Sequence, residues 1–416
     1  MSNKEITTQT QGEFLQDFTE KVPKASHAIL FASQLEITPN DKDGDLLIET
    51  LKTLIEGHEV GIDTKLIIDR HYVDNVTRVN IRDFPNWWPL LTKDERELRR
   101  TNAANTKVWL EKLENANVLQ SFRPRTQSKT HSTKIREIAS IHIAQHWALA
   151  HQKGGVILNS KEDSSFTLST GNLTSSDIYL MNNFATRFTG ERGQYMGKFI
   201  SELMSPEAQL RSSGGHILET DSWVTLLHDY NNTGDPARLP FIHTVAEKLI
   251  DPKRDEYVSN GELITKEPET ILYISQYSPD GKLAIMLDQA QKDGAEVIIP
   301  KQPSGDYREE AFPYNIQTKL SHIKRNKNIL FPIREKPSHF KCLVVKYKDN
   351  TAAILFGSDN YLTHIQKFVR NEEISVLMKI SPDSTEQLST YNDFISKLFE
   401  TKEINKQTYS HLEITT

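Results

Sequence analysis

Apolar and polar positions follow two similar series along this chain. In each series an apolar run of strand length is followed by apolar residues at helical spacing and then by a second apolar run. The first series occupies residues 27–34, 44–55 and 65–69, and the second occupies 271–276, 282–292 and 295–299. This order predicts two strand-helix-strand units, each with parallel strands and a covering helix.

Two further pairs of apolar segments are each separated by a polar turn, which is typical of a β-hairpin. The first pair, 155–158 and 166–168, flanks the polar residues 160–163. The second pair, 342–345 and 352–356, has Asp349 and Asn350 at its midpoint, and both residue types favour turns. We therefore expect one hairpin in each half of the chain.

The same polar residues stand at the ends of both hairpins, and the interval from the histidine to the last asparagine is equal in the two copies. Folding each hairpin at its turn brings an imidazole, an ammonium, a hydroxyl and an amide to one end of two strands. The first copy is His151-Gln152-Lys153 with Ser169-Thr170-Gly171-Asn172, and the second is His339-Phe340-Lys341 with Gly357-Ser358-Asp359-Asn360.

This duplicated pattern, HxK followed by [GS][ST]xN, resembles the motif of the phospholipase D superfamily. The family motif usually carries an Asp five residues after the Lys, where this chain has Leu158 and Lys346. The missing Asp is similar to the motifs of tyrosyl-DNA phosphodiesterase, which also lack it. The resemblance implies an α/β fold with two pseudo-symmetric phospholipase D-like units, each a mostly parallel mixed sheet flanked by helices.

The resemblance also implies a mechanism for a phosphodiester substrate. One histidine attacks phosphorus to form a phosphohistidine, and the other protonates the leaving oxygen and then activates water or an alcohol. We expect His151 to be the nucleophile and His339 the general acid and base, although the reverse order stays open. The other implied site residues are Lys153, Lys341, Asn172 and Asn360 in catalysis, Thr170 and Ser358 in phosphate binding, and Glu373 in orienting a histidine.

Composition narrows the class of protein. A chain of 416 residues is long enough for about two domains. A net charge of −6 provides no general attraction to nucleic acid or anionic lipid, so any anion site must be local. The single Cys342 excludes an intrachain disulfide. Every group that the mechanism needs is organic, so we expect no cofactor and no metal.

The N-terminus has no apolar core for a signal peptide, and no apolar run is long enough to span a bilayer. We therefore expect a cytoplasmic protein, with peripheral membrane contact left open, and a monomer that contains an internal pseudo-dimer. Residues 1–24 are expected to be a polar lead-in. Residues 25–235 are expected to form the first domain and 236–416 the second, and the tail beyond Lys402 is expected to fray.

The first domain carries an insertion at about 80–135 ahead of its motif. Trp87 and Trp88 in it fit either a cap over the substrate or an anchor on the core. Basic residues between Arg123 and Arg136 form a solvated loop or a phosphate-attracting rim. His142 and His146 lie one helical turn apart, but no neighbouring carboxylate or Cys pattern supports a metal site there.

Three functions remain open at this point. The leading hypothesis is a phospholipase D-like phosphodiesterase that hydrolyses or transfers a phosphatidyl group, as cardiolipin synthases do. The alternative is a nucleic-acid phosphodiesterase or nuclease of the same superfamily, favoured by the motifs without Asp and disfavoured by the acidic net charge. A catalytically silent scaffold is disfavoured because the motifs are intact in both halves.

Overall fold

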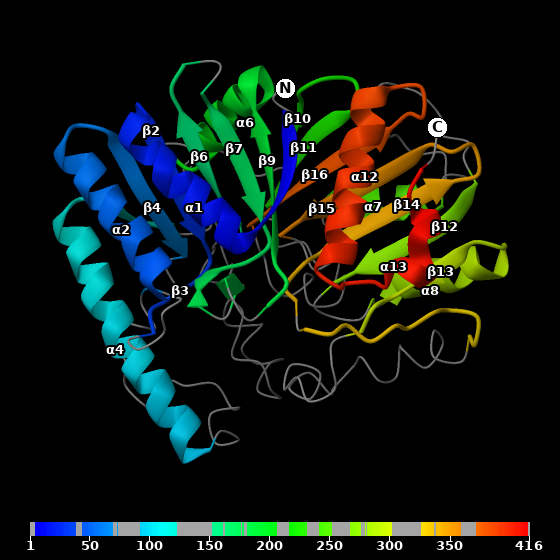
Figure 1. Ribbon diagram of the computed structural model, residues 1–416, viewed down its shortest axis with the longest axis horizontal. Coiled ribbons are helices and arrows are strands. Elements are labelled where there is room, and N and C mark those ends of the chain that lie inside the picture. Colours follow the sequence, from blue (N-terminus) through cyan, green and yellow to red (C-terminus); the bar gives the residue numbers. More distant parts are fainter. Residues whose placement is uncertain are drawn as a thin grey trace, which may run out of the picture. The chain divides into compact units, whose positions relative to one another are not determined.

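The computed structural model describes two compact units, which are treated separately below (Figure 1). Unit 1 lies within Met1–Gly214 and also includes Tyr230–Asp235 and Phe368–Glu373. Unit 2 lies within Gly215–Asp229, Pro236–Lys367 and Ile374–Thr416. The residues that the structure describes are 5–38, 44–69, 73, 92–122, 152–160, 163–175, 177–178, 181–205, 216–230, 241–251, 267–275, 279, 281–301, 326–336, 338–358 and 372–414.

Unit 1 is built on a seven-stranded sheet with the strand order β1-β9-β7-β6-β2-β4-β5. The pairs β2–β4 and β4–β5 are parallel, and the pairs on the other side of β2 are antiparallel. A parallel two-stranded pair, β3 with β8, lies outside this sheet. The strands are β1 (Ile6–Thr10), β2 (His27–Ala32), β3 (Leu35–Glu36), β4 (Asp63–Asp69), β5 (Leu119–Phe122), β6 (Gly154–Leu158), β7 (Ser165–Ser169), β8 (Leu173–Thr174) and β9 (Phe184–Thr189).

Helices supply the apolar partners of this sheet. Helices α1 (Gln11–Lys21), α2 (Gly44–Glu59) and α4 (Lys93–Asn115) contribute leucines and phenylalanines to one core cluster, together with residues of β2 and β4. Helix α6 (Gly190–Leu203) packs on β6, β7 and β9. Burial is nearly continuous along β2, β6 and β7, as expected of strands whose two faces are both covered.

Unit 2 is built on a second seven-stranded sheet, with the order β10-β11-β16-β15-β14-β12-β13. Here β12 and β13 are parallel, while β14 is antiparallel to both β12 and β15. The strands are β10 (His216–Glu219), β11 (Val224–Tyr230), β12 (Pro268–Ile274), β13 (Glu296–Ile298), β14 (Cys342–Tyr347), β15 (Ala352–Gly357) and β16 (Glu372–Ile380).

One core cluster of unit 2 joins α7 (Phe241–Ile250) and α8 (Gly281–Lys292) to Tyr273, Leu343 and Leu355 of the sheet. Helix α12 (Thr385–Glu400) buries Phe394, whose ring lies near those of Phe340 and Phe356. Each unit therefore follows the same order of elements. In unit 1 it is β1, α1, β2, α2, β4, then the hairpin β6–β7, β9 and α6, and in unit 2 it is β11, α7, β12, α8, β13, then β14–β15, β16 and α12.

This repeat corrects the expectation that residues 1–24 are a polar lead-in. Strand β1 pairs with β9 at the edge of the sheet, and Phe14, Leu15 and Phe18 of α1 are buried in the core. These three apolar residues stand among polar ones in the sequence, but in the folded helix they lie on one face, as in an amphipathic helix. Thr10 and Glu13 form a capping box that begins this helix. The lead-in is thus an integral part of unit 1.

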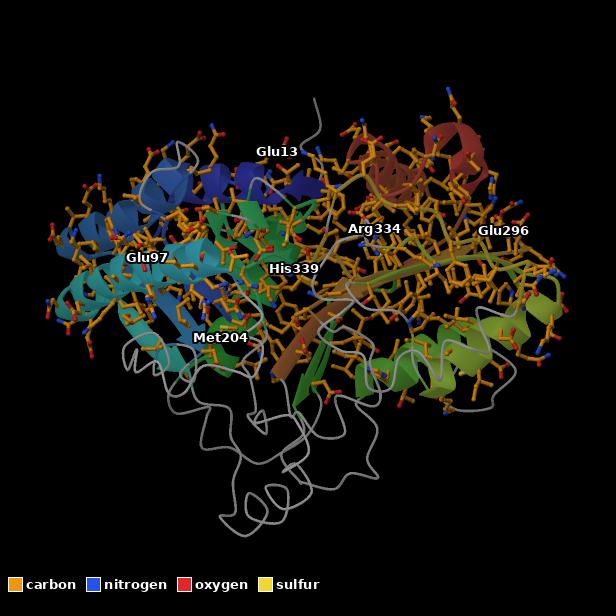
Figure 2. All side chains as sticks on the ribbon, turned by 90° about the horizontal axis from the view of Figure 1, so that it is seen from below. Glu13, Glu97, Met204, Glu296, Arg334 and His339 are labelled. Atoms are coloured by element: carbon orange, nitrogen blue, oxygen red, sulfur yellow. The ribbon has the colours of Figure 1, made fainter. Side chains whose placement is uncertain are left out.

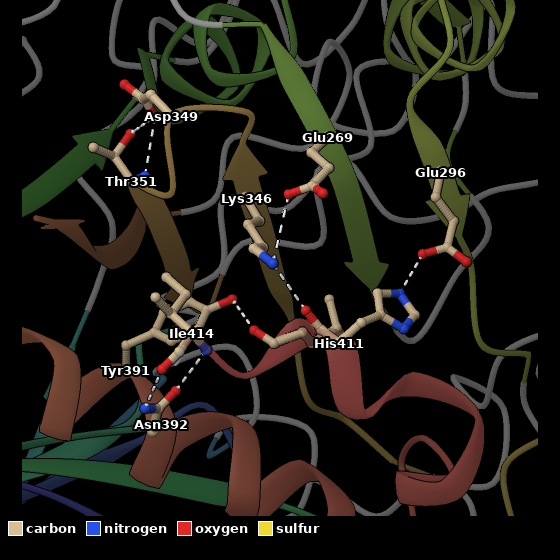
Figure 3. Close-up of polar contacts among 10 residues, drawn as sticks. Glu269, Glu296, Lys346, Asp349, Thr351, Tyr391, Asn392, His411 and Ile414 are labelled. Atoms are coloured by element: carbon tan, nitrogen blue, oxygen red, sulfur yellow. Dashed lines mark hydrogen bonds and ion pairs between the residues drawn. The ribbon is translucent and has the colours of Figure 1, made fainter. Parts of the chain in front are cut away.

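The C-terminal segment also differs from expectation, because residues 403–414 are folded against unit 2 and do not fray. A short helix α13 (Lys406–Tyr409) and a 3-10 turn (Ser410–Leu412) follow α12. The hydroxyl of Tyr391 donates to the carbonyl of Leu412 at 2.8 Å, and Lys346 donates to that of His411 at 3.0 Å (Figure 3). The sequence pattern missed this because the buried apolar residues of the segment are widely spaced.

The predicted fold class is confirmed: two pseudo-symmetric α/β units, each a mixed sheet flanked by helices. The parallel share of each sheet is smaller than predicted, because the motif hairpins and their neighbours pair antiparallel. The predicted strands at 27–34, 65–69 and 271–276 and the helices at 44–55 and 282–292 are all present.

Parts of the predicted organisation lie outside the described residues. They include Trp87, Trp88, the basic residues from Arg123 to Arg136, and His142 and His146. Among the helices that the structure describes, none has the length and apolar character needed to cross a bilayer.

Candidate active site

The first motif lies at the open end of the hairpin β6–β7. Lys153 immediately precedes β6, and its carbonyl accepts a hydrogen bond from the backbone N–H of Ser169 at 2.9 Å, which extends the hairpin by one pair. The Lys153 residue is only 1% exposed. An ammonium group is held at such a position only with hydrogen-bond acceptors or an anion nearby. This end of the hairpin therefore presents a buried cation.

The hydroxyl of Thr170 ties the motif to the neighbouring strand. The backbone N–H of Thr170 donates to the carbonyl of Phe184 at 3.0 Å, and the hydroxyl donates to the same carbonyl at 3.3 Å. The N–H of Phe184 donates back to the hydroxyl at 3.4 Å. The single hydroxyl proton is used inside the protein, so the predicted donation from Thr170 to phosphate stays a prediction that requires an exchange of this bond.

Asn172 is oriented by a serine at the end of another strand. Ser33 directly follows β2, and its hydroxyl donates to Oδ1 of Asn172 at 2.6 Å. Because Oδ1 is occupied, the Asn172 side chain keeps its Nδ2 group as the end that can donate to a substrate. The N–H of Leu173 also donates to the carbonyl of Gln34 at 3.1 Å, which fixes the chain on the far side of Asn172.

A buried carboxylate holds the turn that carries Asn172. Asp177 accepts hydrogen bonds from the N–H of Asn172 at 3.1 Å and from the hydroxyl of Thr174 at 3.1 Å. The amide Nδ2 of Asn183 donates to the Asp177 carboxylate at 2.9 Å and to its carbonyl at 2.8 Å. Gln11 of α1 adds a further contact, since it accepts the hydroxyl proton of Ser169. Asp177, Asn183 and Gln11 therefore all support the turn that carries Asn172.

The second motif begins just before β14. Phe340 is buried against Phe394 of α12, with ring centroids 5.9 Å apart. Its N–H donates to the hydroxyl of Ser338 at 2.9 Å. Since neighbouring residues of an extended chain point to opposite faces, the anchored Phe340 directs His339 and Lys341 to the other face. His339 is 7% exposed and Lys341 is 1% exposed, so both are buried.

Ser358 repeats the bonding of Thr170. Its backbone N–H donates to the carbonyl of Ile374 at 2.9 Å, its hydroxyl donates to the same carbonyl at 3.3 Å, and the N–H of Ile374 donates back at 3.0 Å. The carbonyl of Lys341 accepts from the N–H of Gly357 at 3.3 Å, as that of Lys153 accepts from Ser169. The two motifs therefore share one backbone arrangement.

This correspondence also aligns the residues that follow the motifs. Phe184 and Ile374 play the same part, so the residues before them, Asn183 and Glu373, occupy matching positions. Glu373 is 3% exposed and stands near the start of β16. The sequence alone gave only a loose match between these two residues, because the segments between motif and strand differ in length.

One position differs in size between the two copies. Gly357 corresponds to Ser169, and a Cβ at Gly357 would lie 2.3 Å from the carbonyl oxygen of Ile374 and 2.4 Å from Oγ of Ser375. In unit 1 the residue paired with Ser169 is the smaller Ala185. In unit 2 the serine of this pair is therefore on the neighbouring strand, as Ser375, and Gly357 leaves space for its hydroxyl.

Burial changes the ionisation of groups next to the second motif. Burial raises the pKa of the Cys342 thiol well above its ordinary value, and the nearby Glu403 carboxylate raises it further. Burial lowers the pKa of the Arg334 guanidinium, an effect that Glu403 opposes. Cys342 is consequently a neutral thiol next to Lys341, without the character of a nucleophile.

Two of the predicted site residues, His151 and Asn360, lie outside the described residues. In the part of the chain that the structure describes, no group of three or more His, Cys, Asp or Glu side chains is arranged to hold a metal ion. Sequence reasoning missed Gln11 and Asp177, which contact the first motif, and it missed the buried ion pair of Arg334 and Glu403 in unit 2. Ser33 does have a sequence signal, because Ser33-Gln34 recurs as Ser275-Gln276 at the matching place in the second half.

No model of a known protein family matches this chain, and no curated protein sequence matches it either. Its fold is similar to that of phosphatidylserine synthase from Haemophilus influenzae Rd KW20, with a TM-score of 0.59, 11% sequence identity, and coverage of 97% of this chain and 87% of that chain. At this identity the similarity shows the fold alone.

Two other solved structures are less similar. Polyphosphate kinase from Porphyromonas gingivalis has a TM-score of 0.48 with 11% identity, covering 95% of this chain and 50% of that chain. Yeast tyrosyl-DNA phosphodiesterase also has a TM-score of 0.48, with 12% identity, covering 92% of this chain and 91% of that chain.

Proposed function

We propose that this protein is a metal-independent phosphodiesterase or phosphatidyltransferase that works through a phosphohistidine, in the manner of the phospholipase D superfamily. The observation that carries the proposal is the repeated bonding of Thr170 and Ser358, each after a buried lysine. Two unrelated structural hairpins have no reason to repeat a lysine, a hydroxyl bridge and an asparagine in the same order. The resemblance of the two sequence motifs implies a reaction that uses groups of both copies.

The chemistry follows from the charge of the substrate. A phosphodiester carries negative charge that resists attack, so its oxygens must be neutralised before a nucleophile can approach. Lys153 and Lys341 supply that charge without a metal, and the amides of Asn172 and Asn360 supply directed hydrogen bonds. The bond from Ser33 to Asn172 supports this role, since it leaves the amide N–H₂ of Asn172 as the donor.

Each half of the reaction needs a different histidine. In the proposed first step one imidazole attacks phosphorus, and the other gives its proton to the leaving oxygen. In the second step the deprotonated imidazole takes a proton from water or an alcohol, which attacks the phosphohistidine and frees the first imidazole. Phosphorus thereby changes partners twice, and the proton returns to the same imidazole.

Our proposal keeps His151 as the nucleophile and His339 as the general acid and base, with the reverse order as the alternative. By resemblance to the superfamily, Glu373 is the carboxylate that orients one of the two histidines and stabilises its protonated form. The matching residue in the first half is Asn183, a neutral amide that is held by Asp177. The first half therefore has a neutral amide where the second half has a carboxylate.

A phosphatidyl group is the substrate that we favour. The similarity of fold to a phosphatidylserine synthase supports it, and so does the acidic net charge of −6, which opposes binding to nucleic acid. The alternative is a nucleic-acid phosphodiester, for which the specific observation is that neither motif carries the usual Asp. Hydrolysis and transfer differ only in whether water or an alcohol is the second nucleophile.

The deciding experiment compares three substrates on purified protein: phosphatidylglycerol in mixed micelles, an oligonucleotide with a 3′ phosphodiester adduct, and bis(p-nitrophenyl) phosphate. We expect cleavage of the activated diester and of the lipid, with a new phosphatidyl ester when glycerol or serine is added. Cleavage of the oligonucleotide alone would establish the alternative. Failure on all three would contradict the proposed function.

Chelation provides an independent test of the mechanism. We expect full activity on the activated diester after dialysis against EDTA, because every proposed group is organic. Loss of activity that returns with Mg²⁺, Ca²⁺ or Zn²⁺ would contradict the proposal. The soluble activated diester is the appropriate substrate, since a metal can alter a lipid surface without entering the site.

A further inference from the structure

Arg334 reaches the backbone at the ends of two strands of unit 2. Its side chain is fully buried, and Nη2 donates to the carbonyl of Ser275 at 2.7 Å and to that of Pro300 at 3.0 Å. Ser275 directly follows β12, and Pro300 follows β13. These strands are parallel, so one guanidinium connects their carboxyl ends. The planar guanidinium suits this arrangement, because Nη2 contacts both carbonyls while Nε faces Glu403.

The second motif starts at this same edge of the sheet. Strand β14 runs antiparallel to β12 with Ile274 opposite Cys342, so the next pair along this register is Ser275 and Lys341. His339 lies two residues further along. Figure 2 labels both Arg334 and His339. The carbonyl that Arg334 holds therefore belongs to the residue beside Lys341.

The charge of Arg334 is balanced by the C-terminal segment. Oε2 of Glu403 lies 3.3 Å from Nε of Arg334, and both side chains are 0% exposed. Burial lowers the pKa of Arg334, and Glu403 opposes that change. A buried guanidinium without a counter-charge is strongly disfavoured. The position of Arg334 at the motif edge therefore depends on a carboxylate brought from the end of the chain.

The segment that carries Glu403 is fastened to the same sheet. Glu403 follows α12, the helix that packs on Phe340 of the motif, and its N–H donates to the carbonyl of Leu398 at 3.0 Å. Further along, His411 contacts Glu296 of β13, and its carbonyl accepts from Lys346 of β14 (Figure 3). The segment Thr401–Ile414 thus spans the strands that lead to the motif.

We infer that the segment Thr401–Ile414 supports the second motif, and that Arg334 and Glu403 are positioning residues for Lys341 and His339. The pair holds Ser275 and Pro300 at the edge where the motif begins. The catalytic consequence rests on the proposed function, whereas the ordering of the motif segment does not.

The structure supplies a matched control in the neighbouring residues. Glu335, next to Arg334, and Lys402, next to Glu403, form an ion pair between the same two segments, with 2.7 Å between Nζ and Oε2. Their side chains are 61% and 63% exposed. Exposed pairs contribute little to stability. Loss of this pair removes a charge contact between the segments without touching Ser275 or Pro300.

The test uses the double variant R334M/E403L, because apolar residues of similar size commonly replace a buried ion pair without loss of stability. We expect a melting temperature close to that of the wild type, a kcat on bis(p-nitrophenyl) phosphate reduced roughly 10- to 100-fold, and little change in KM. R334K should not restore kcat, since a single ammonium nitrogen cannot contact both carbonyls and also face Glu403, as Nη2 and Nε of arginine do. Glu335→Gln should behave as wild type.

Hydrogen exchange of peptides covering 338–344 gives a readout that needs no activity. We expect faster exchange in R334M/E403L than in the wild type and no change in Glu335→Gln. Wild-type kcat and exchange in a folded double variant would overturn the inference, and so would an equal effect of Glu335→Gln. If the wild type cleaves no diester, the proposed function fails, and the exchange result alone decides this inference.

Discussion

The two motifs share one backbone frame but are stabilised by different means. In unit 1 the motif turn is held by neutral and charged hydrogen bonds from Ser33, Gln11 and Asp177. In unit 2 the corresponding edge is held by the buried pair of Arg334 and Glu403 and by the aromatic contact of Phe340. A duplicated motif can therefore keep its polar residues and backbone bonding while each copy changes its supporting residues.

The largest difference between the copies is expected in their histidines. His151→Ala and His339→Ala should each lower turnover of a natural diester by roughly 10²- to 10⁴-fold. His339→Ala should retain part of its activity on bis(p-nitrophenyl) phosphate, because that leaving group needs no proton, whereas His151→Ala should not. Steady-state rates on both substrates check this, and equal losses on the two substrates in both variants would remove the division of roles.

The size difference between Ser169 and Gly357 gives the next test. Gly357→Ala should lower the free energy of unfolding by about 3 kcal/mol, because the added Cβ would lie 2.3 Å from a backbone oxygen. Ser169→Ala should cost only about 1 kcal/mol, through its lost hydrogen bonds. Urea denaturation measures both. Adding Ser375→Gly to Gly357→Ala should not restore stability, since the closest atom is the carbonyl of Ile374.

Asp177 tests the network that is specific to unit 1. Asp177→Asn replaces a carboxylate that accepts from Asn172, Thr174 and Asn183, and the new amide hydrogens face those donors. We expect the free energy of unfolding to fall by roughly 2 kcal/mol. The measurement is denaturant unfolding at neutral pH. A variant as stable as the wild type would show that the turn does not depend on this carboxylate.

The smallest expected effect is the reactivity of Cys342. Because burial raises its pKa, the folded protein should react with a thiol reagent at neutral pH only as fast as it unfolds. The thiol loses its proton more readily in the unfolded chain, so this group makes stability fall as the pH rises above the ordinary thiol pKa. Reaction with Ellman's reagent in buffer and in denaturant measures it, and rapid labelling of the native protein would contradict the burial.

The sequence predicted the hairpins and the paired strand-helix-strand units, because each depends on local periodicity and on spacing. It failed for β1 and α1, whose apolar residues become a core face only when packed on the sheet. It could not place Arg334 opposite Glu403, since a buried ion pair between distant segments leaves no local pattern. The support of Asn172 by Asp177 was hidden for a related reason, because an Asp in a turn usually faces solvent.

The central claim is that one histidine carries phosphorus during turnover, and rapid-quench labelling tests it most directly. Wild-type protein and His339→Ala are mixed with an activated diester labelled at phosphorus and quenched in alkali, and the labelled peptide is identified. We predict an acid-labile phosphohistidine at His151 that accumulates in His339→Ala and is absent from His151→Ala. Label on His339 would reverse the roles, and turnover with no labelled histidine in any variant would contradict the account.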